Sequence, residues 1–84
     1  MISKIRGNVI GEPVIKDGGL KGRYMKFTIK EDNGYYVNVV VWDPKRFNVL
    51  EEARAAGELS GTLKAEAYID KNNQPRPRLT LNIN

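Results

Sequence analysis

The chain has 84 residues, 40% of them hydrophobic, and its 14 Lys and Arg against 10 Asp and Glu give a formal charge of +4. It has no cysteine and no histidine, which excludes disulfides, Cys/His metal sites and catalysis by a nucleophile paired with histidine. A chain this short forms one small core, so we expect a single domain over residues 1–84, with no cofactor and no enzymatic activity. No segment resembles a signal peptide or a membrane span, which favours a cytoplasmic location.

The basic excess favours a polyanionic partner. Acidic side chains gather around a helix candidate in the middle of the chain, at Glu51, Glu52 and Glu58. The predicted strands and loops carry most of the basic ones, namely Lys4, Arg6, Lys21, Arg23, Lys26, Lys30, Arg76 and Arg78. We therefore expect the strand surface to be more basic than the net charge suggests.

Residues 2–10 alternate between apolar and polar side chains, which predicts a first strand. Gly7 indicates a bend or bulge within it, because glycine marks such positions inside strands. Pro13 lacks an N–H and interrupts the hydrogen bonding, after which residues 14–15 are expected to resume the strand. The glycine-rich residues 17–22 predict a turn and loop.

A second strand is predicted over residues 23–30, with an apolar inner face and a basic outer face. Its inner residues are Met25, Phe27 and Ile29, and its outer residues are Tyr24, Lys26, Thr28 and Lys30. Asn33-Gly34 follows, the strongest short signal for a tight hairpin because both residues accept positive φ. The second and third strands should therefore pair antiparallel, with their outer residues on one surface.

The third strand, residues 35–42, is the most informative stretch of the chain. Alternation assigns Tyr35, Val37, Val39 and Val41 to a core face, and Tyr36, Asn38, Val40 and Trp42 to the other face. With one helix candidate available to cover the sheet, much of this second face should be exposed. Exposed aromatic rings on a strand form a stacking platform for unpaired bases. The alternative is that Trp42 is partly buried core, as Trp often is.

The remaining elements complete an alternation of strands with one helix. Residues 43–57 begin with Asp-Pro and end with Gly, and their helical apolar spacing predicts a short helix that covers one open end of a barrel. Residues 58–70 predict a long fourth strand, whose inner residues are Leu59, Gly61, Leu63, Ala65, Ala67 and Ile69. Residues 70–77, with two prolines, predict a polar loop, and residues 78–83 a fifth strand with Leu79, Leu81 and Ile83 inward.

Three strands, a short helix and two further strands are the element order of the OB fold. We therefore predict an all-β protein, a five-stranded Greek-key OB-fold barrel with one short helix between strands three and four. In this fold the ligand lies on strands two and three and on the loops that join strands one to two and four to five. Those are the elements in which the basic and aromatic residues of this chain concentrate.

Several motifs, in order and over nearly the whole chain, resemble those of a known family. They are Gly7-Asn8-Val9 with Gly11 and Pro13, Phe27-Thr28-Ile29, Tyr36 to Trp42, Gly61-Thr62-Leu63, Tyr68 with Asp70, and Asn73-Gln74 with Arg76. The family is that of the bacterial-type single-stranded-DNA-binding proteins (SSB), to which primosomal replication protein N is related. The resemblance implies that Tyr36, Trp42 and Tyr68 stack on bases. It also implies a homo-oligomer, a dimer or tetramer, in which the first strand pairs with its symmetry mate.

Three departures from this family bear on function. The loop at residues 31–34 is short where the family has a long DNA-contacting loop, which suggests a smaller footprint on DNA. No acidic recruitment tail is visible after residue 83, so recruitment of partner enzymes through such a tail is not expected. Glu66 lies on the outer face of the fourth strand, where a binding surface would favour a cation.

These observations predict a non-enzymatic protein that binds single-stranded DNA largely without regard to sequence. The predicted stacking residues are Tyr36, Trp42 and Tyr68, and Tyr24 and Asn38 are further predicted nucleic-acid-binding residues. The predicted phosphate contacts are Lys21, Arg23, Lys26, Lys30, Lys64 and Arg76, since cations that neutralise phosphates release counterions.

Two other functions fit the same residues. RNA is one possible ligand, because a stacking platform does not distinguish the 2′-hydroxyl without a specific contact. A protein-interaction or assembly module is the other, because aromatic and Arg side chains are enriched at protein interfaces as well. Any single lysine could also be a solvated charge that keeps a sheet edge soluble.

Overall fold

The computed structural model describes residues 2–83 as strands joined by tight turns and one α-helix. The elements are β1 (Ser3–Asp17), β2 (Arg23–Glu31), β3 (Tyr36–Val41), α1 (Val49–Ala56), β4 (Glu58–Ile69) and β5 (Pro75–Ile83), with 3₁₀ turns η1 (Gly19–Lys21) and η2 (Pro44–Arg46). No helix in this part of the chain is long and apolar enough to cross a membrane.

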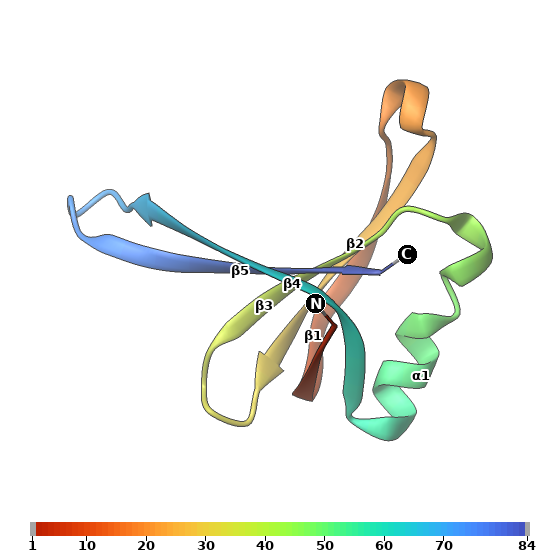
Figure 1. The fold of residues 1–84 in the computed structure, drawn as a ribbon, viewed down its shortest axis with the longest axis horizontal. Helices are drawn as coiled ribbons and strands as arrows, with labels where there is room; N and C mark the ends of the chain where they lie inside the picture. The colour runs from red at the N-terminus through yellow and green to blue at the C-terminus, as the bar shows by residue number, and fades with distance from the viewer. Residues whose placement is uncertain (1, 84) are drawn as a thin grey trace.

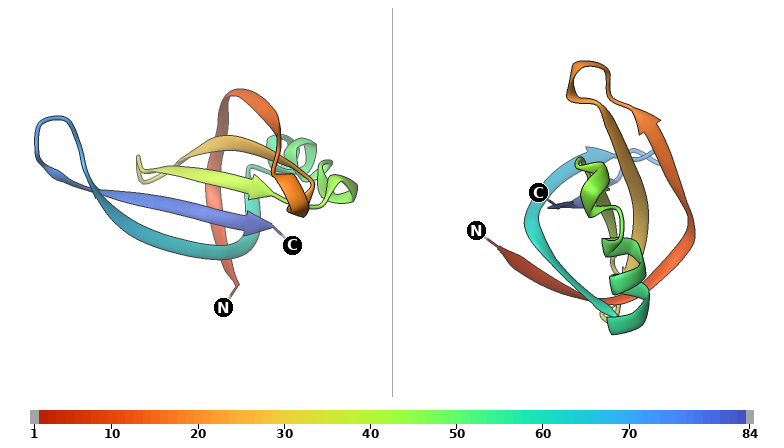
Figure 2. Two further views of the ribbon diagram at one scale, coloured as in Figure 1. Left: turned by 90° about the horizontal axis from the view of Figure 1, so that it is seen from above. Right: turned by 90° about the vertical axis from the view of Figure 1, so that its right-hand side faces the viewer.

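The strands close into a barrel in the order β1-β2-β3-β5-β4 (Figures 1 and 2). Strands β3 and β5 pair in parallel, and the other neighbours pair antiparallel. This order, with the helix between β3 and β4, is that of the OB fold. The predicted fold class is confirmed.

The core follows the predicted strand alternation on β2, β3 and β5. Its buried apolar side chains are Ile5, Met25, Phe27, Ile29, Val37, Val39, Val41, Val49, Leu50, Ala53, Leu59, Leu81 and Ile83. Full burial of an aliphatic side chain stabilises the fold by about 1.5–3 kcal/mol relative to exposure, so these residues dominate its stability. Since inner and outer residues alternate, burying the three valines of β3 turns the side chains between them outward.

The helix begins later than its sequence signals predict. Asp43 Oδ1 accepts a hydrogen bond from the Lys45 N–H (3.0 Å), but it caps the short turn η2 and not α1. The α-helix starts at Val49 and ends as expected at Gly57, whose φ of 70° suits glycine. Through its buried side chains α1 packs on β4 and β1.

Strand β1 is long because it pairs with two neighbouring strands in turn. Its first residues pair with β4, and from Gly7 onward it pairs with β2. Gly7 lies where the strand changes partner, and a Cβ there would overlap the carbonyl oxygen of Lys30. The register with β2 shifts between Ile10 and Val14, around Pro13, so β1 continues past the proline as expected.

The hairpin between β2 and β3 forms as predicted, with a different turn. The Gly34 N–H donates to the Glu31 carbonyl (2.9 Å), and the Glu31 N–H donates to the Tyr35 carbonyl (2.8 Å). Of the Asn-Gly pair, Gly34 alone has positive φ (92°). The prediction that Tyr35 faces the core is wrong: its side chain is 56% exposed, because it precedes β3 at the end of the barrel.

Strands β4 and β5 extend beyond the barrel as a two-stranded arm over residues 65–78 (Figure 1, teal and blue). The arm and α1 lie on opposite sides of the barrel. The prediction that Leu63, Ala65, Ala67 and Ile69 face a core is wrong, since all four are exposed, Ile69 by 62%. Alternation does place them on one face, but no opposing layer of the barrel reaches that far.

The two prolines expected in a loop belong to β5, which starts at Pro75. Pro77 pairs with Ala67 and Pro75 with Ile69 on β4. On its other side β5 pairs with β3 only from Leu79 onward. The prolines thus occupy the part of β5 that is an edge strand, where a missing N–H is tolerated.

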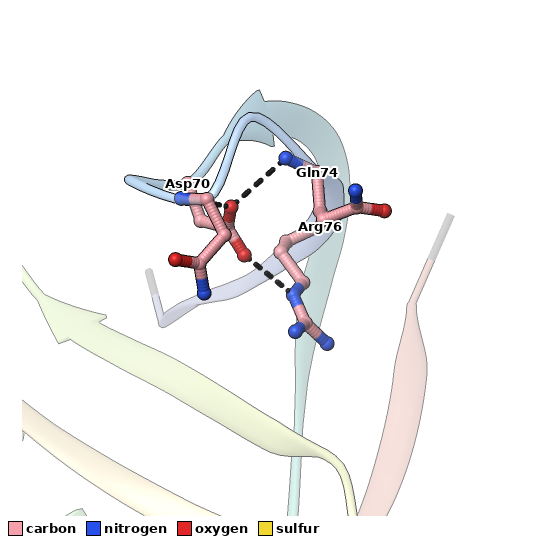
Figure 3. Close-up of polar contacts among 4 residues, drawn as sticks. Asp70, Gln74 and Arg76 are labelled. Carbon is pink, nitrogen blue, oxygen red and sulfur yellow. Dashed lines mark hydrogen bonds and ion pairs between the residues drawn. The ribbon is translucent and has the colours of Figure 1, made fainter.

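Asp70 organises the turn at the tip of the arm (Figure 3). Its Oδ1 accepts the N–H groups of Asn72 and Gln74, each at 2.9 Å, and its Oδ2 accepts from Nε of Arg76 at 2.9 Å. The Arg76 guanidinium, followed by the Gln74 N–H, holds the pKa of this carboxyl below its ordinary value of 3.8. Asn73 takes positive φ (60°), which asparagine tolerates.

Replacing Asp70 by Ala should loosen this turn without unfolding the barrel. The substitution removes the acceptor of two backbone N–H groups, so amide hydrogen exchange at Asn72 and Gln74 should accelerate several-fold while exchange at Val39 stays unchanged. Asp32→Ala, in the β2–β3 hairpin, is the matched control and should leave the arm unaffected. Because the folded pKa is lowered, acid should loosen the wild-type turn only as the pH falls below about 3.8. Unchanged exchange in Asp70→Ala would show that the turn does not depend on this carboxylate.

Candidate functional site

A row of polar side chains crosses the outer face of four strands. By register Thr28 lies opposite Asn38, Asn38 beside Thr80, and Thr80 opposite Lys64. The Thr28 hydroxyl donates a hydrogen bond to Asn38 Oδ1 (3.5 Å), so the NH₂ group of Asn38 is not the group that this bond uses. Asn38 and Thr80 are half-buried and form a hydrogen-bonding floor.

Tyr24 and Trp42 lie together on one side of this row. Their ring centroids are 4.7 Å apart at an interplanar angle of 40°. A Cβ on Gly18 would come within 2.7 Å of the Trp42 ring and 3.3 Å of Tyr24, so the β1–β2 loop packs against both rings. Trp42 is therefore neither core nor a free platform: it is half-buried, with its ring shared between the loop and the groove described below.

A second aromatic group lies on the other side of the row. Tyr36 is 58% exposed and Tyr68 39% exposed. The Lys30 ammonium lies 6.0 Å from the centroid of the Tyr36 ring, and the Arg78 guanidinium lies 4.7 Å from that of Tyr68. Each ring thus has a cation within cation–π range, so stacking and charge are available at the same place.

Two adjoining hollows connect these aromatic groups, and we call them together the groove. One has a volume of about 550 Å³ and is lined by Tyr24, Lys26, Asn38, Val40, Trp42, Glu66, Arg78 and Thr80. The other has a volume of about 390 Å³ and is lined by Gly34, Tyr35, Tyr36, Asn38, Tyr68, Pro77, Arg78 and Leu79. Asn38 and Arg78 line both, so they stand at the middle of the groove.

The structure brings together most of the predicted site. Tyr24, Tyr36, Asn38, Trp42, Tyr68 and Lys26 all line the groove, and Lys30 flanks it beside Tyr36. Arg23 is exposed at the start of β2 and lies opposite Asp17, away from the groove-lining set. Lys21 belongs to η1, and its side chain lies outside the described part of the chain.

Two of the predicted phosphate contacts are engaged in ion pairs, one at the base of the arm and one at its tip. Lys64 lies 3.0 Å from Glu66, and Arg76 lies 2.9 Å from Asp70. Both cations remain more than half exposed, so a ligand can still reach them. Exposed pairs of this kind are weak, and they reduce the positive charge offered by the arm without removing it.

Arg78 is the principal groove residue that the sequence prediction missed. The signal was present, because Leu79 faces inward and strand alternation turns Arg78 outward. Tyr35 was missed because it was assigned to the core. Thr80 was missed because its place beside Asn38 depends on the parallel pairing of β3 with β5, which no local pattern shows.

Comparison with known proteins gives a fold but no family. No protein-family model matches the chain, and no curated protein sequence matches it. Two crystal forms of Rim1, a mitochondrial single-stranded DNA binding protein from S. cerevisiae, have a similar structure. One form gives a TM-score of 0.63 at 18% identity and covers 98% of this chain and 87% of Rim1, and the other gives 0.60 at 19% identity with coverage of 96% and 88%. At this identity the likeness shows a shared fold.

Proposed function

We propose that this protein binds single-stranded DNA largely without sequence preference and without catalysis. The observation that carries the proposal is the groove, which joins two aromatic groups across a polar floor on the ligand-binding face of an OB fold. The likeness to a single-stranded DNA binding protein of the same fold supports it.

Bases stack on the exposed rings of Tyr36 and Tyr68 and on the part of the Trp42 ring that lines the groove. Stacking tolerates any sequence because every base has a π face. A duplex buries its base faces between neighbouring pairs, so the same rings gain nothing from double-stranded DNA. The aromatic rings line a groove and do not form a flat basic surface, so they favour single-stranded DNA over a duplex.

Cations beside the rings hold the phosphates. Lys26 and Lys30 lie on the outer face of β2, next to Trp42 and Tyr36 respectively, and Arg78 stands between the two aromatic groups. Phosphate contacts fix the position of the strand and carry no sequence information. Lys64 at the base of the arm and Arg76 near its tip extend this track and share their charge with the phosphates.

The protein associates with itself through β1. Beyond Arg6 this strand pairs with β2 on one side, and no strand in residues 2–83 pairs with its other edge. Three large apolar side chains of this stretch are exposed: Ile10, Val14 and Ile15. An open edge with apolar side chains invites pairing with a second copy, which would also enlarge the modest core.

Titration with oligonucleotides should quench the fluorescence of Trp42, the single Trp of the chain. Oligo-dT should bind at both low and moderate salt, and duplex DNA should bind more weakly. Oligo-U is the third ligand, and its affinity relative to oligo-dT measures the preference for DNA over RNA. Equal affinity for duplex and oligo-dT would contradict the proposal.

Removing a stacking ring should weaken oligo-dT binding. Trp42→Ala and Tyr36→Ala should each cost about 1–3 kcal/mol of binding free energy, the usual value of one stacked base. Tyr36→Phe keeps the ring and is the matched control, so it should bind nearly as the wild type does. Fluorescence anisotropy of a labelled oligonucleotide measures binding, and thermal unfolding checks the fold of each variant. If Trp42→Ala unfolds while Tyr36→Ala binds oligo-dT normally, the rings contribute only to the stability of the fold.

Salt dependence should identify the cations that bind phosphate. Removing one such cation should reduce the slope of log affinity against log salt by about 0.7 for a single strand. Lys26→Ala and Lys30→Ala should each show this reduction, whereas Lys45→Ala, on η2 outside the groove-lining set, should keep the wild-type slope. Equal slopes in all three variants would place the DNA elsewhere.

Light scattering at micromolar concentration should report an oligomer, most simply a dimer. Ile15→Lys, which places a charge on the exposed apolar side of β1, should shift the mass toward the monomer of 9.5 kDa. Lys45→Ala again serves as the control. A monomeric wild type would contradict association through β1.

A further inference from the structure

Glu66 is the acidic side chain among the residues that line the groove. It lies on β4 directly opposite Arg78, and its carboxylate forms an ion pair with Lys64 at 3.0 Å. A carboxylate repels the phosphates of a bound strand, so its presence weakens the interaction that the neighbouring cations strengthen.

Packing gives no reason for a carboxylate at this position. Glu66 is exposed on the arm, and nothing in residues 2–83 buries it. The hydrogen bond and charge of Lys64, and then the charge of Arg78, lower the pKa of Glu66 below its ordinary value of 4.5. The group is therefore fully ionised at neutral pH and acts only as a hydrogen-bond acceptor.

A hydrogen-bond acceptor in the groove distinguishes bases by the donors and acceptors that their edges present. Cytosine presents the N4 amino group, a donor, next to its N3 and O2 acceptors, whereas thymine presents the O4 acceptor in the place of that amino group. A carboxylate accepts from cytosine N4 and is repelled by thymine O4; thymine keeps one donor on this edge, its N3–H, at the position where cytosine has an acceptor. Asn38 and Arg78, the donors at the middle of the groove, complement the cytosine acceptors beside N4.

We propose that Glu66 reads one base at the middle of the groove and favours cytosine, whose N4 amino group is a donor, over thymine. The proposal rests on the proposed binding of single strands and adds a local preference to it. The stacking groups on either side remain indifferent to sequence, so the preference concerns one position and not the whole bound strand.

The test compares oligo-dC with oligo-dT at pH 7.5 for the wild type and for Glu66→Gln. The Gln side chain keeps the shape, but its amide can donate to thymine as well as accept from cytosine. The ratio of the affinity for oligo-dC to the affinity for oligo-dT should be about fivefold higher for the wild type than for the variant. This is a modest effect for one exposed base contact. Glu66→Ala should lose the preference in the same way.

Glu52→Gln, which removes a carboxylate on α1, is the matched control and should keep the wild-type ratio. If Glu66→Gln binds oligo-dC and oligo-dT more tightly by the same factor, the proposal is overturned, because Glu66 would then only repel phosphates. The proposed binding of single strands would be unaffected by that result. An unchanged ratio of affinities in Glu66→Gln would also overturn the proposed role of Glu66. Failure of the wild type to bind either oligomer would overturn both proposals.

Discussion

The parallel pairing of β3 with β5 is the constraint on which the rest of the structure depends. It closes the barrel and sets Val39 beside Leu81, both of which are fully buried. The same register sets Asn38 beside Thr80 on the outer face and so forms the floor of the groove. Because the pairing starts only at Leu79, the earlier part of β5 has no neighbour on that side, and the arm results.

The two sides of the groove differ in how much positive charge they offer. On the arm and at its base, Arg76 and Lys64 share their charge with neighbouring carboxylates, so this side of the groove offers less positive potential than its sequence suggests. On β2, no ion pair engages Lys26 or Lys30 among the described residues, and Lys30 stands by the Tyr36 ring. Phosphate binding should therefore depend mainly on the lysines of β2. The arm should contribute mainly through the Tyr68 ring and through the other side chains with which it lines the groove.

Local patterns in the sequence predicted the strands, the hairpin, the helix and the outward face that carries Tyr36 and Asn38. They failed where the outcome depends on how far a neighbouring layer extends. Alternation correctly grouped Ala65 with Ala67, but it could not show that the barrel ends before them. Likewise, the half-buried state of Trp42 depends on Gly18, which lies in a loop distant in sequence, and the place of Thr80 in the groove depends on the parallel pairing of β3 with β5.

A single strand bound in the groove would cross β2, β3 and β5. Mapping backbone amide chemical shifts by NMR during titration with unlabelled oligo-dT tests this placement most directly. Binding in the groove should produce the largest changes on Thr28, Asn38 and Thr80, with none on α1. Changes confined to α1 and η2, with the strands of the groove unaffected, would contradict it.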